Sequence, residues 1–171
     1  NDDFIIYDEN GNLVNIVIYA ICHDYIIFIT TIDGGNHLRC AYKSQNPSKP
    51  AVFLNINGLI YDIFSGHSTS AITNEKGEFI IFTQSNLSDV TKPFEWISLP
   101  DDEKAAKISC GNDICIIGCE SGRLYKLDLN KPFELKLVSE LKDLTVVKIS
   151  GISQHFFALT SDKQLFGLGS N

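Results

Sequence analysis

The cysteines are the residues most able to do chemistry, and three of the five lie close together in the sequence. Cys110, Cys115 and Cys119 are spaced C-x4-C-x3-C, which does not match the short knuckles of structural zinc sites. In an extended strand Cys115 and Cys119 would face one side about 13 Å apart, too far to share an ion. We therefore expect no metal, and we interpret all five, with Cys22 and Cys40, as reduced core thiols of an intracellular protein.

The four histidines are the candidates for acid–base chemistry. They are His23, His37, His67 and His155. A catalytic base needs a nucleophile within hydrogen-bonding reach and a third group that orients it, and no such set surrounds any of the four. We predict structural roles, above all for His67 and His155, which lie in or beside a repeated pattern. No catalytic residue is predicted.

Two further motifs have only a partial similarity to functional signatures. Asp33-Gly34-Gly35-Asn36 is glycine-rich, but no helix follows it and no Lys-Ser/Thr closes it, so we expect a hairpin turn and not a phosphate cradle. Asn86-Leu87-Ser88 fits the glycosylation pattern, and we interpret it as a chance match in a protein with free cysteines. We predict no cofactor.

Two features could contact a partner protein. Trp96, with Phe94, could be an interface anchor; their counterparts elsewhere in the chain, Leu135 and Phe133, are apolar, so we expect both in the core. The acidic run Asp101-Asp102-Glu103 is most simply a solvated turn, and the alternative is a contact for a basic partner surface. Neither feature identifies a partner-binding residue.

Composition excludes several classes of function. The chain has 171 residues, 44% of them hydrophobic, and a net charge of −7. The acidic charge argues against direct nucleic-acid binding. No apolar run approaches the ~20 residues of a membrane-spanning helix, and from the opening residues we expect no signal peptide. Because the chain contains no Met and starts at Asn1, we expect a segment of a longer protein.

The clearest organising feature is an internal repeat. Residues 107–130 align without a gap on residues 148–171 at an offset of 41, with identities such as Lys107/Lys148 and Leu124/Leu165. Weaker copies occupy residues 64–86 and 18–46. The units run approximately 1–45, 46–85, 86–129 and 130–171, within a single domain of residues 1–171. Four whole repeats of this kind predict stacked units.

Each unit has the pattern of short strands joined by turns. Continuous apolar runs at 25–30, 114–118 and 156–160 are typical of strands buried on both faces. Partial alternation at 94–99 and 133–137 predicts half-buried strands. Turn residues separate them at the positions 9–12, 33–36, 75–77, 120–122 and 161–163. An all-β unit of three or four strands is a propeller blade.

The last unit carries a more specific likeness. Residues 149–171 contain His155, Ala158-Leu159-Thr160, Phe166, Gly169 and Asn171, and they resemble the signature of the regulator of chromosome condensation 1 (RCC1)-like repeat family. Members of that family are seven-bladed β-propellers with repeats nearer fifty residues. The shorter repeats and the count of four leave two arrangements: a closed four-bladed ring, or part of a larger propeller. Four blades in an open arc would expose apolar faces, which favours a closed or oligomeric assembly.

The resemblance implies a non-catalytic protein–protein interaction module, a scaffold of a signalling or ubiquitin-pathway protein in the cytoplasm or nucleus. The alternative is guanine-nucleotide exchange on a small GTPase, weakened because no inserted β-wedge stands out. A hydrolase or lyase on a propeller scaffold is a third hypothesis, without residues to carry it. The expected partner is another protein, with a small GTPase as one candidate, or a second copy bound through exposed blade edges; no membrane is involved.

Overall fold

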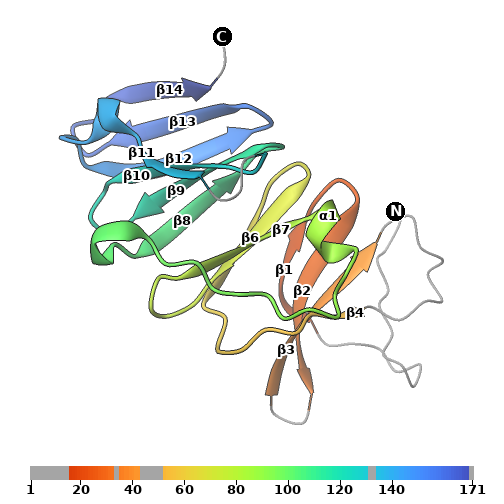
Figure 1. The fold of residues 1–171 in the computed structure, drawn as a ribbon. Helices are drawn as coiled ribbons and strands as arrows, with labels where there is room; N and C mark the ends of the chain where they lie inside the picture. Colours follow the sequence, from red (N-terminus) through yellow and green to blue (C-terminus); the bar gives the residue numbers. More distant parts are fainter. Residues whose placement is uncertain (1–15, 33–34, 43–51, 131–133, 170–171) are drawn as a thin grey trace.

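The chain folds into four antiparallel sheets that follow one another along the sequence (Figure 1). The computed structural model describes residues 16–32, 35–42, 52–130 and 134–169. Sheet 1 consists of β1 (Ile16–Ile21), β2 (Tyr25–Ile32), β3 (Gly35–Tyr42) and β4 (Val52–Phe53). Sheet 2 consists of β5 (Asp62–Ser65), β6 (Thr69–Thr73) and β7 (Phe79–Thr83). Sheet 3 consists of β8 (Ala105–Cys110), β9 (Ile114–Cys119), β10 (Leu124–Asp128) and β11 (Glu134–Leu137), and sheet 4 of β12 (Val146–Ile152), β13 (His155–Thr160) and β14 (Leu165–Gly169).

Helical structure in the described ranges is confined to short segments. These are α1 (Gln84–Leu87) and the 3-10 turns Pro100–Asp102 and Ser139–Leu141. None of the described helices is long and apolar enough to cross a membrane. The all-β fold expected from the repeat is confirmed.

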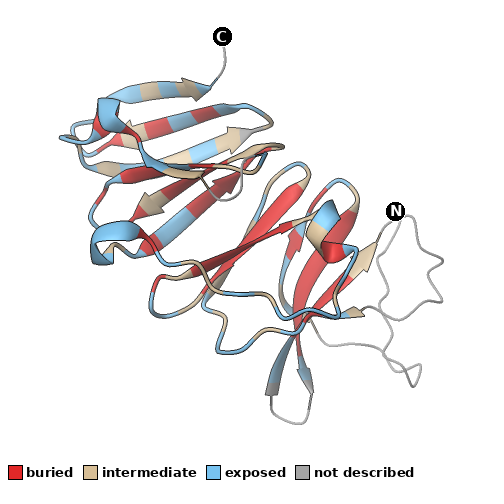
Figure 2. Ribbon diagram, viewed as in Figure 1, coloured by how far each residue is buried: buried red, intermediate tan, exposed pale blue. Residues whose placement is uncertain are grey.

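The second strand of each sheet is its most buried, and this explains the continuous apolar runs in the sequence. All five residues of β6 are buried, as are most of β9 (Figure 2). Both faces of these strands are covered, so side chains of either parity must be apolar. Figure 2 shows the contrast with β14, where exposed and half-buried positions alternate.

The outer strand of two sheets comes from the start of the following repeat. β4 pairs with β3, and β11 pairs with β10, although each follows the repeat boundary predicted from the sequence. In sheet 2 the equivalent place is taken by the segment 94–99, which forms only two isolated bridges, Phe79↔Ile97 and Ile56↔Phe94. The continuous strand predicted at 94–99 is therefore wrong. Phe94 donates its N–H to the carbonyl of Asn55 and not to β7, although its ring packs on that of Phe82.

Successive sheets pack face to face through apolar clusters. Between sheets 1 and 2 lie Tyr25, Ile27 and Phe82, and between sheets 2 and 3 lie Phe79 and Ile117. A third cluster joins sheets 3 and 4; its buried members are Ile116, Leu124, Val138, Leu141, Phe156 and Ala158. The core is thus a series of inter-sheet layers, as blade stacking requires.

The four sheets form an open arc. Figure 1 places sheet 1 at one end of the arc and sheet 4 at the other, with sheets 2 and 3 between them. Of the two arrangements left open by the sequence, the closed four-bladed ring is not the one adopted by the single chain. Among the described residues, one face of sheet 1 and one face of sheet 4 have no neighbouring sheet, although Ile26 and Phe28 on that face of sheet 1 are buried.

Candidate interaction edge

The turns that join the first and second strands of the four sheets lie next to one another along one edge of the arc (Figure 1). We call this set the turn edge; it consists of residues 22–24, 66–68, 111–113 and 153–154. Three of the turns close in the same way, with the N–H of Cys22, Gly66 or Gly111 donating to the carbonyl three residues later. Equivalent turns thus recur every 44 or 45 residues, which brings the same part of each repeat to the same edge.

The first junction of the turn edge joins two histidines. The His23 N–H donates to the carbonyl oxygen of His67 over 2.6 Å, and the two ring centroids lie 5.1 Å apart. His23 Nδ1 also lies 2.8 Å from a carboxylate oxygen of Asp24. Both imidazoles are exposed, so they present polar rings to solvent while their backbones are fixed. The sequence did not relate His23 to His67.

The other two junctions meet at Asn112. Its Oδ1 accepts a hydrogen bond from Ser68 Oγ over 3.3 Å, and its Nδ2 donates to Ser153 Oγ over 3.2 Å. The Asn112 backbone N–H donates to the Ser153 carbonyl over 3.1 Å. Below it, Thr69 Oγ1 donates to the carbonyl of Gly111. One half-buried asparagine therefore ties together the turns of sheets 2, 3 and 4.

Two glycines allow the turns to approach this closely. A Cβ added at Gly66 would stand 2.1 Å from the carbonyl oxygen of Cys110, and one at Gly111 would stand 2.0 Å from that of Ser153. Real Cβ atoms do not come so near a backbone oxygen, so any larger residue would push the neighbouring turn away. The close contact of the turns therefore depends on these two residue types.

A buried layer of thiols and hydroxyls supports the turn edge from below. Cys22 Sγ donates to the carbonyl of Thr69 over 3.3 Å. Cys110 and Cys115 face each other across β8 and β9; their hydrogen bond, followed by burial, raises the pKa of Cys110 well above its usual range. The Tyr25 hydroxyl donates to the carbonyl of Phe82 over 3.0 Å, and burial raises its pKa. These protonated groups are poor nucleophiles at neutral pH.

The three cysteines that lie close together in the sequence are not gathered at one place in the described structure. Cys110 and Cys115 are neighbours, whereas Cys119 lies at the far end of β9. Burial, then the nearby carboxylate of Glu103, raises the pKa of Cys119 to about 12. All five cysteines are buried free thiols, and the described residues contain no group of three His, Cys, Asp or Glu able to hold an ion.

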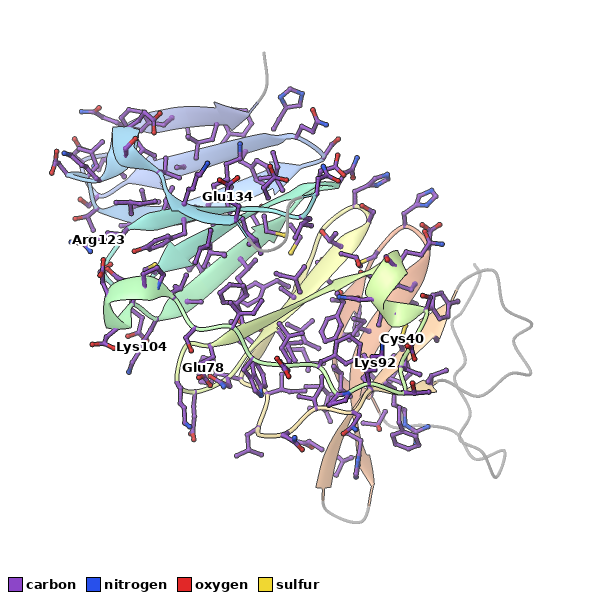
Figure 3. The ribbon with its side chains drawn as sticks, viewed as in Figure 1. Cys40, Glu78, Lys92, Lys104, Arg123 and Glu134 are labelled. Carbon is purple, nitrogen blue, oxygen red and sulfur yellow. The ribbon has the colours of Figure 1, made fainter. Side chains whose placement is uncertain are left out.

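The acidic loop is tied to the opposite edge of the arc. Arg123 Nη1 lies 3.4 Å from a carboxylate oxygen of Glu103 and 4.0 Å from one of Asp101, next to the loop that continues into Lys104 (Figure 3). Glu103 also accepts a hydrogen bond from Ser121 Oγ over 2.7 Å. Two of the three acidic side chains thus have partners inside the chain, which leaves less charge for a basic partner.

The remaining predicted residues lie elsewhere. Trp96 is half-buried against the cluster between sheets 1 and 2, and its Nε1–H donates to the carbonyl of Asn57. His37 packs edge-on against Phe53, with ring centroids 5.8 Å apart. His155 is exposed at the start of β13, beside the turn edge. The expected turn at 33–36 lies partly outside the described residues. The expected turn at 9–12 lies entirely outside them.

The Asn86 amide is used inside the fold. Its Oδ1 accepts the N–H of Thr83 over 2.8 Å, and its Nδ2 donates to the carbonyl of Ile81 over 2.9 Å. Together with the Thr83 side chain, it forms a capping box at the start of α1. This contact explains why an asparagine ends the strand–turn pattern here.

Sequence reasoning missed the turn edge, although a signal for it was present. Asn112 and Ser153 were not singled out, and they are equivalent at the repeat offset of 41. A short polar turn precedes each buried second strand, as in Cys22-His23-Asp24 and Gly66-His67-Ser68. Aligning those turns, rather than the apolar strands alone, would have placed them side by side.

These features define a class of fold. Four meandering sheets, stacked face to face in an arc, are the blades of a β-propeller. No protein-family model and no curated protein matches the sequence.

Solved propellers are similar in structure. Human WBSCR16 matches with a TM-score of 0.65 and 15% identity, over 92% of this chain and 48% of that one. Yeast RCC1 (Prp20), solved bound to Kap60, matches with a TM-score of 0.64 and 14% identity, over 91% and 44%. The WD40 domain of Toxoplasma gondii coronin matches with a TM-score of 0.55 and 15% identity, over 96% and 46%. At these identities the likeness shows the fold alone, and the chain spans about half the length of the structures it matches.

Proposed function

We propose that this chain is a non-catalytic interaction module of the RCC1-like type, which presents its turn edge to another protein. The observation that carries the proposal is that hydrogen bonds join each of the four turns to the next: His23 to His67, Ser68 to Asn112, and Asn112 to Ser153. Residues held by such a network lose little further freedom on binding, and loops on a rigid scaffold are the usual carriers of recognition.

The chemistry of the turn edge favours a protein as the partner. The side chains of His23, His67 and Gln154 are exposed, and those of Asp24 and Asn112 are half-buried. They offer hydrogen-bond donors and acceptors without a cluster of basic groups. Because the whole chain carries a net charge of −7, a phosphate backbone would be repelled.

The proposal also covers the cellular location of the protein, its division into repeats and the pathway in which it acts. Buried free thiols support a place inside the cell, in the cytoplasm or nucleus. The first three strands of each sheet fall within one proposed repeat, 1–45, 46–85, 86–129 or 130–171, which supports that division of the domain. A role in signalling or the ubiquitin pathway follows only from the RCC1-like resemblance.

The test compares two triple variants of the full chain. The turn-edge variant carries His23→Ala, His67→Ala and Gln154→Ala. The matched control alters three exposed residues at the opposite edge: Glu75→Ala, Glu120→Ala and Ser161→Ala. Proteins captured from the source cells by the unaltered chain are purified, and their binding to each variant is measured by calorimetry.

We expect the turn-edge variant to weaken a captured partner's binding at least tenfold, and the control to leave it unchanged. Equal effects of the two variants, or no partner that binds the purified chain, would contradict the proposal. The alternative, exchange activity, is measured with the same protein as release of a fluorescent guanine nucleotide from small GTPases; an accelerated release would favour it over a scaffold.

A further inference from the structure

A glycine inside a strand leaves a gap in sheet 3. Gly118 is the fifth residue of β9, and the fifth residues of β2, β6 and β13 are Ile29, Thr73 and Leu159. A glycine in a strand interior weakens the strand, and it often marks a place where a ligand or another backbone comes close. Sheet 3 therefore lacks a side chain at a position where the other sheets have one.

Neither packing nor backbone conformation requires a glycine at this position. A Cβ added at Gly118 would meet the side chains of Ile149 and Leu124 at 3.6 Å, which is ordinary contact. The φ of Gly118 is not in the left-handed region, unlike that of Gly122 at +89°. Gly118 thus leaves room that a larger side chain could fill.

The room beside Gly118 is part of a cavity between sheets 3 and 4. The first strands of these sheets, β8 and β12, lie side by side (Figure 1). The cavity has a volume of about 270 Å³, and its apolar lining includes Ala106, Val146, Val147 and Ile149. Pockets that hold a whole small molecule span about 300–1,000 Å³. This cavity is therefore better matched to one apolar side chain of a larger partner.

The rim of the cavity is formed by two β-bulges. The strand pairing shifts at Ala106 of β8 and at Val147 of β12. Both residues line the cavity and both are exposed, Val147 by 46%. Bulges are common beside binding sites, because they redirect a side chain. β8 and β12 are also edge strands of their sheets, and an extended peptide is the form that a sheet edge binds.

Two lysines give the rim a positive charge. Lys107 and Lys148 both line the cavity and are exposed. Lys107 Nζ donates to the carbonyl of Val147 over 3.0 Å, which holds this side chain across the gap between the sheets. Neither lysine forms an ion pair with a described residue. The described lining includes one carboxylate, that of Glu120. Positive charge thus prevails here, although the whole chain carries a net charge of −7, and it favours an anionic partner.

We propose that this cavity binds an acidic, extended segment of a partner protein. An apolar side chain of the segment fills the space beside Gly118, and carboxylates on either side of it reach Lys107 and Lys148. Alternate residues of an extended peptide share one face, so the acidic residues stand two positions before and after the apolar one. The described lining contains no residue of the turn edge. This site is therefore separate from the one in the proposed function and does not depend on it.

The experiment measures binding of a fluorescein-labelled peptide, Gly-Asp-Ser-Phe-Ser-Asp-Gly, to the full chain by fluorescence anisotropy. We expect saturable binding that weakens at least tenfold when Ala replaces Phe or when Lys replaces both Asp residues. Gly118→Leu places at this position the residue type found at Leu159, so it should fill the cavity and weaken binding at least tenfold. Its resistance to urea should equal or exceed that of the wild type, because a Cβ at Gly118 makes only ordinary contacts. Gly118→Val is a second variant for the same test.

Two charge-reversal pairs separate the lysines of the cavity from the net charge of the chain. Lys107→Glu with Lys148→Glu should weaken binding of the peptide at least tenfold. Lys76→Glu with Lys92→Glu makes the same change in net charge at exposed positions outside the cavity. At about 0.15 M salt, which screens charges over about 8 Å, this control pair should leave binding unchanged.

Several results would overturn the proposal. One is the absence of saturable binding of the peptide to the wild-type chain. Others are equal effects of the two lysine pairs, or undiminished binding to folded Gly118→Leu and Gly118→Val. Free phenylacetate that binds as tightly as the peptide would also overturn it, because the cavity would then be a small-molecule site.

Discussion

Asn112 Nδ2 donates a hydrogen bond to Ser153 Oγ over 3.2 Å, and this contact joins the turns of sheets 3 and 4. On the other side, Asn112 Oδ1 accepts a hydrogen bond from Ser68 of sheet 2. We expect Asn112→Ala to lower the free energy of unfolding by about 1–2 kcal/mol, since each lost bond contributes about 0.5–1.5 kcal/mol. Urea denaturation measures this.

Asn112→Asp is the matched comparison for that prediction. It keeps an acceptor for Ser68 and removes the donor to Ser153, so its loss of stability should lie between those of wild type and Asn112→Ala. If Asn112→Ala were as stable as the wild type, the turn edge would not be held by this side chain.

The approach of Gly111 to sheet 4 gives a second prediction. Because a Cβ there would stand 2.0 Å from the Ser153 carbonyl oxygen, Gly111→Ala must displace one turn, and we expect a loss of about 1–3 kcal/mol. Gly167→Ala is the control, since nothing lies within 4 Å of a Cβ at that strand position. Thermal unfolding of the two variants compares them; an equal effect would show that the turns can separate without cost.

The strands and the fold class were predictable because they follow from local patterns and repetition. Apolar runs of both parities marked β2, β9 and β13, and the offset of 41 between the last two units indicated stacked blades. The strand predicted at 94–99 failed for a physical reason. Pro93 and Pro100 bound the segment and lack N–H donors, and only Ile97 forms the paired bonds with Phe79.

The turn edge was less predictable because it depends on contacts between repeats. His23 and His67 are 44 residues apart, but their neighbours differ: Cys22 and Asp24 on one side, Gly66 and Ser68 on the other. No local sequence pattern indicates that the backbone N–H of His23 donates to the backbone carbonyl of His67. The sequence pattern also could not predict that the four sheets form an open arc, because this depends on the angle between successive sheets.

Lys163 carries an unfavourable backbone conformation that a substitution should relieve. Its φ is +69°, and the equivalent residue of sheet 3, Gly122, has a φ of +89°. A side chain in the left-handed region costs about 1–2 kcal/mol, and glycine's greater freedom in the unfolded chain offsets part of that. We therefore expect Lys163→Gly to raise the free energy of unfolding by about 0.5 kcal/mol.

The reverse substitution at Gly122 should have the opposite and larger effect. A Cβ there would meet Thr145 Cγ2 at 2.7 Å in addition to the strained φ. Gly122→Lys should therefore lower the free energy of unfolding, as measured in the same urea titration. A stabilising Gly122→Lys, or a destabilising Lys163→Gly, would mean that this turn is not held in the left-handed conformation.

Cys40, labelled in Figure 3, has a buried thiol. We expect this thiol to make the stability of the fold depend on pH in the alkaline range. Burial, then the neighbouring Cys22, raises the pKa of Cys40 to about 12, against about 8.5 in an unfolded chain. Because the folded state holds the proton more tightly, this contribution is complete below pH of about 8.5 and is lost as the pH rises toward 12. The loss is at most about 1.4 kcal/mol per pH unit.

The measurement is urea unfolding under reducing conditions at pH 7.5 and pH 10. Between these pH values, Cys40→Ala should lose about 1–2 kcal/mol less stability than the wild type, because it has no thiol to ionise on unfolding. Leu38→Ala, on the same strand and equally buried, should lower stability at both pH values without changing that difference. If Cys40→Ala lost as much stability as the wild type, the alkaline sensitivity would have to come from other buried acids, of which Tyr25 and Cys110 have raised pKa values.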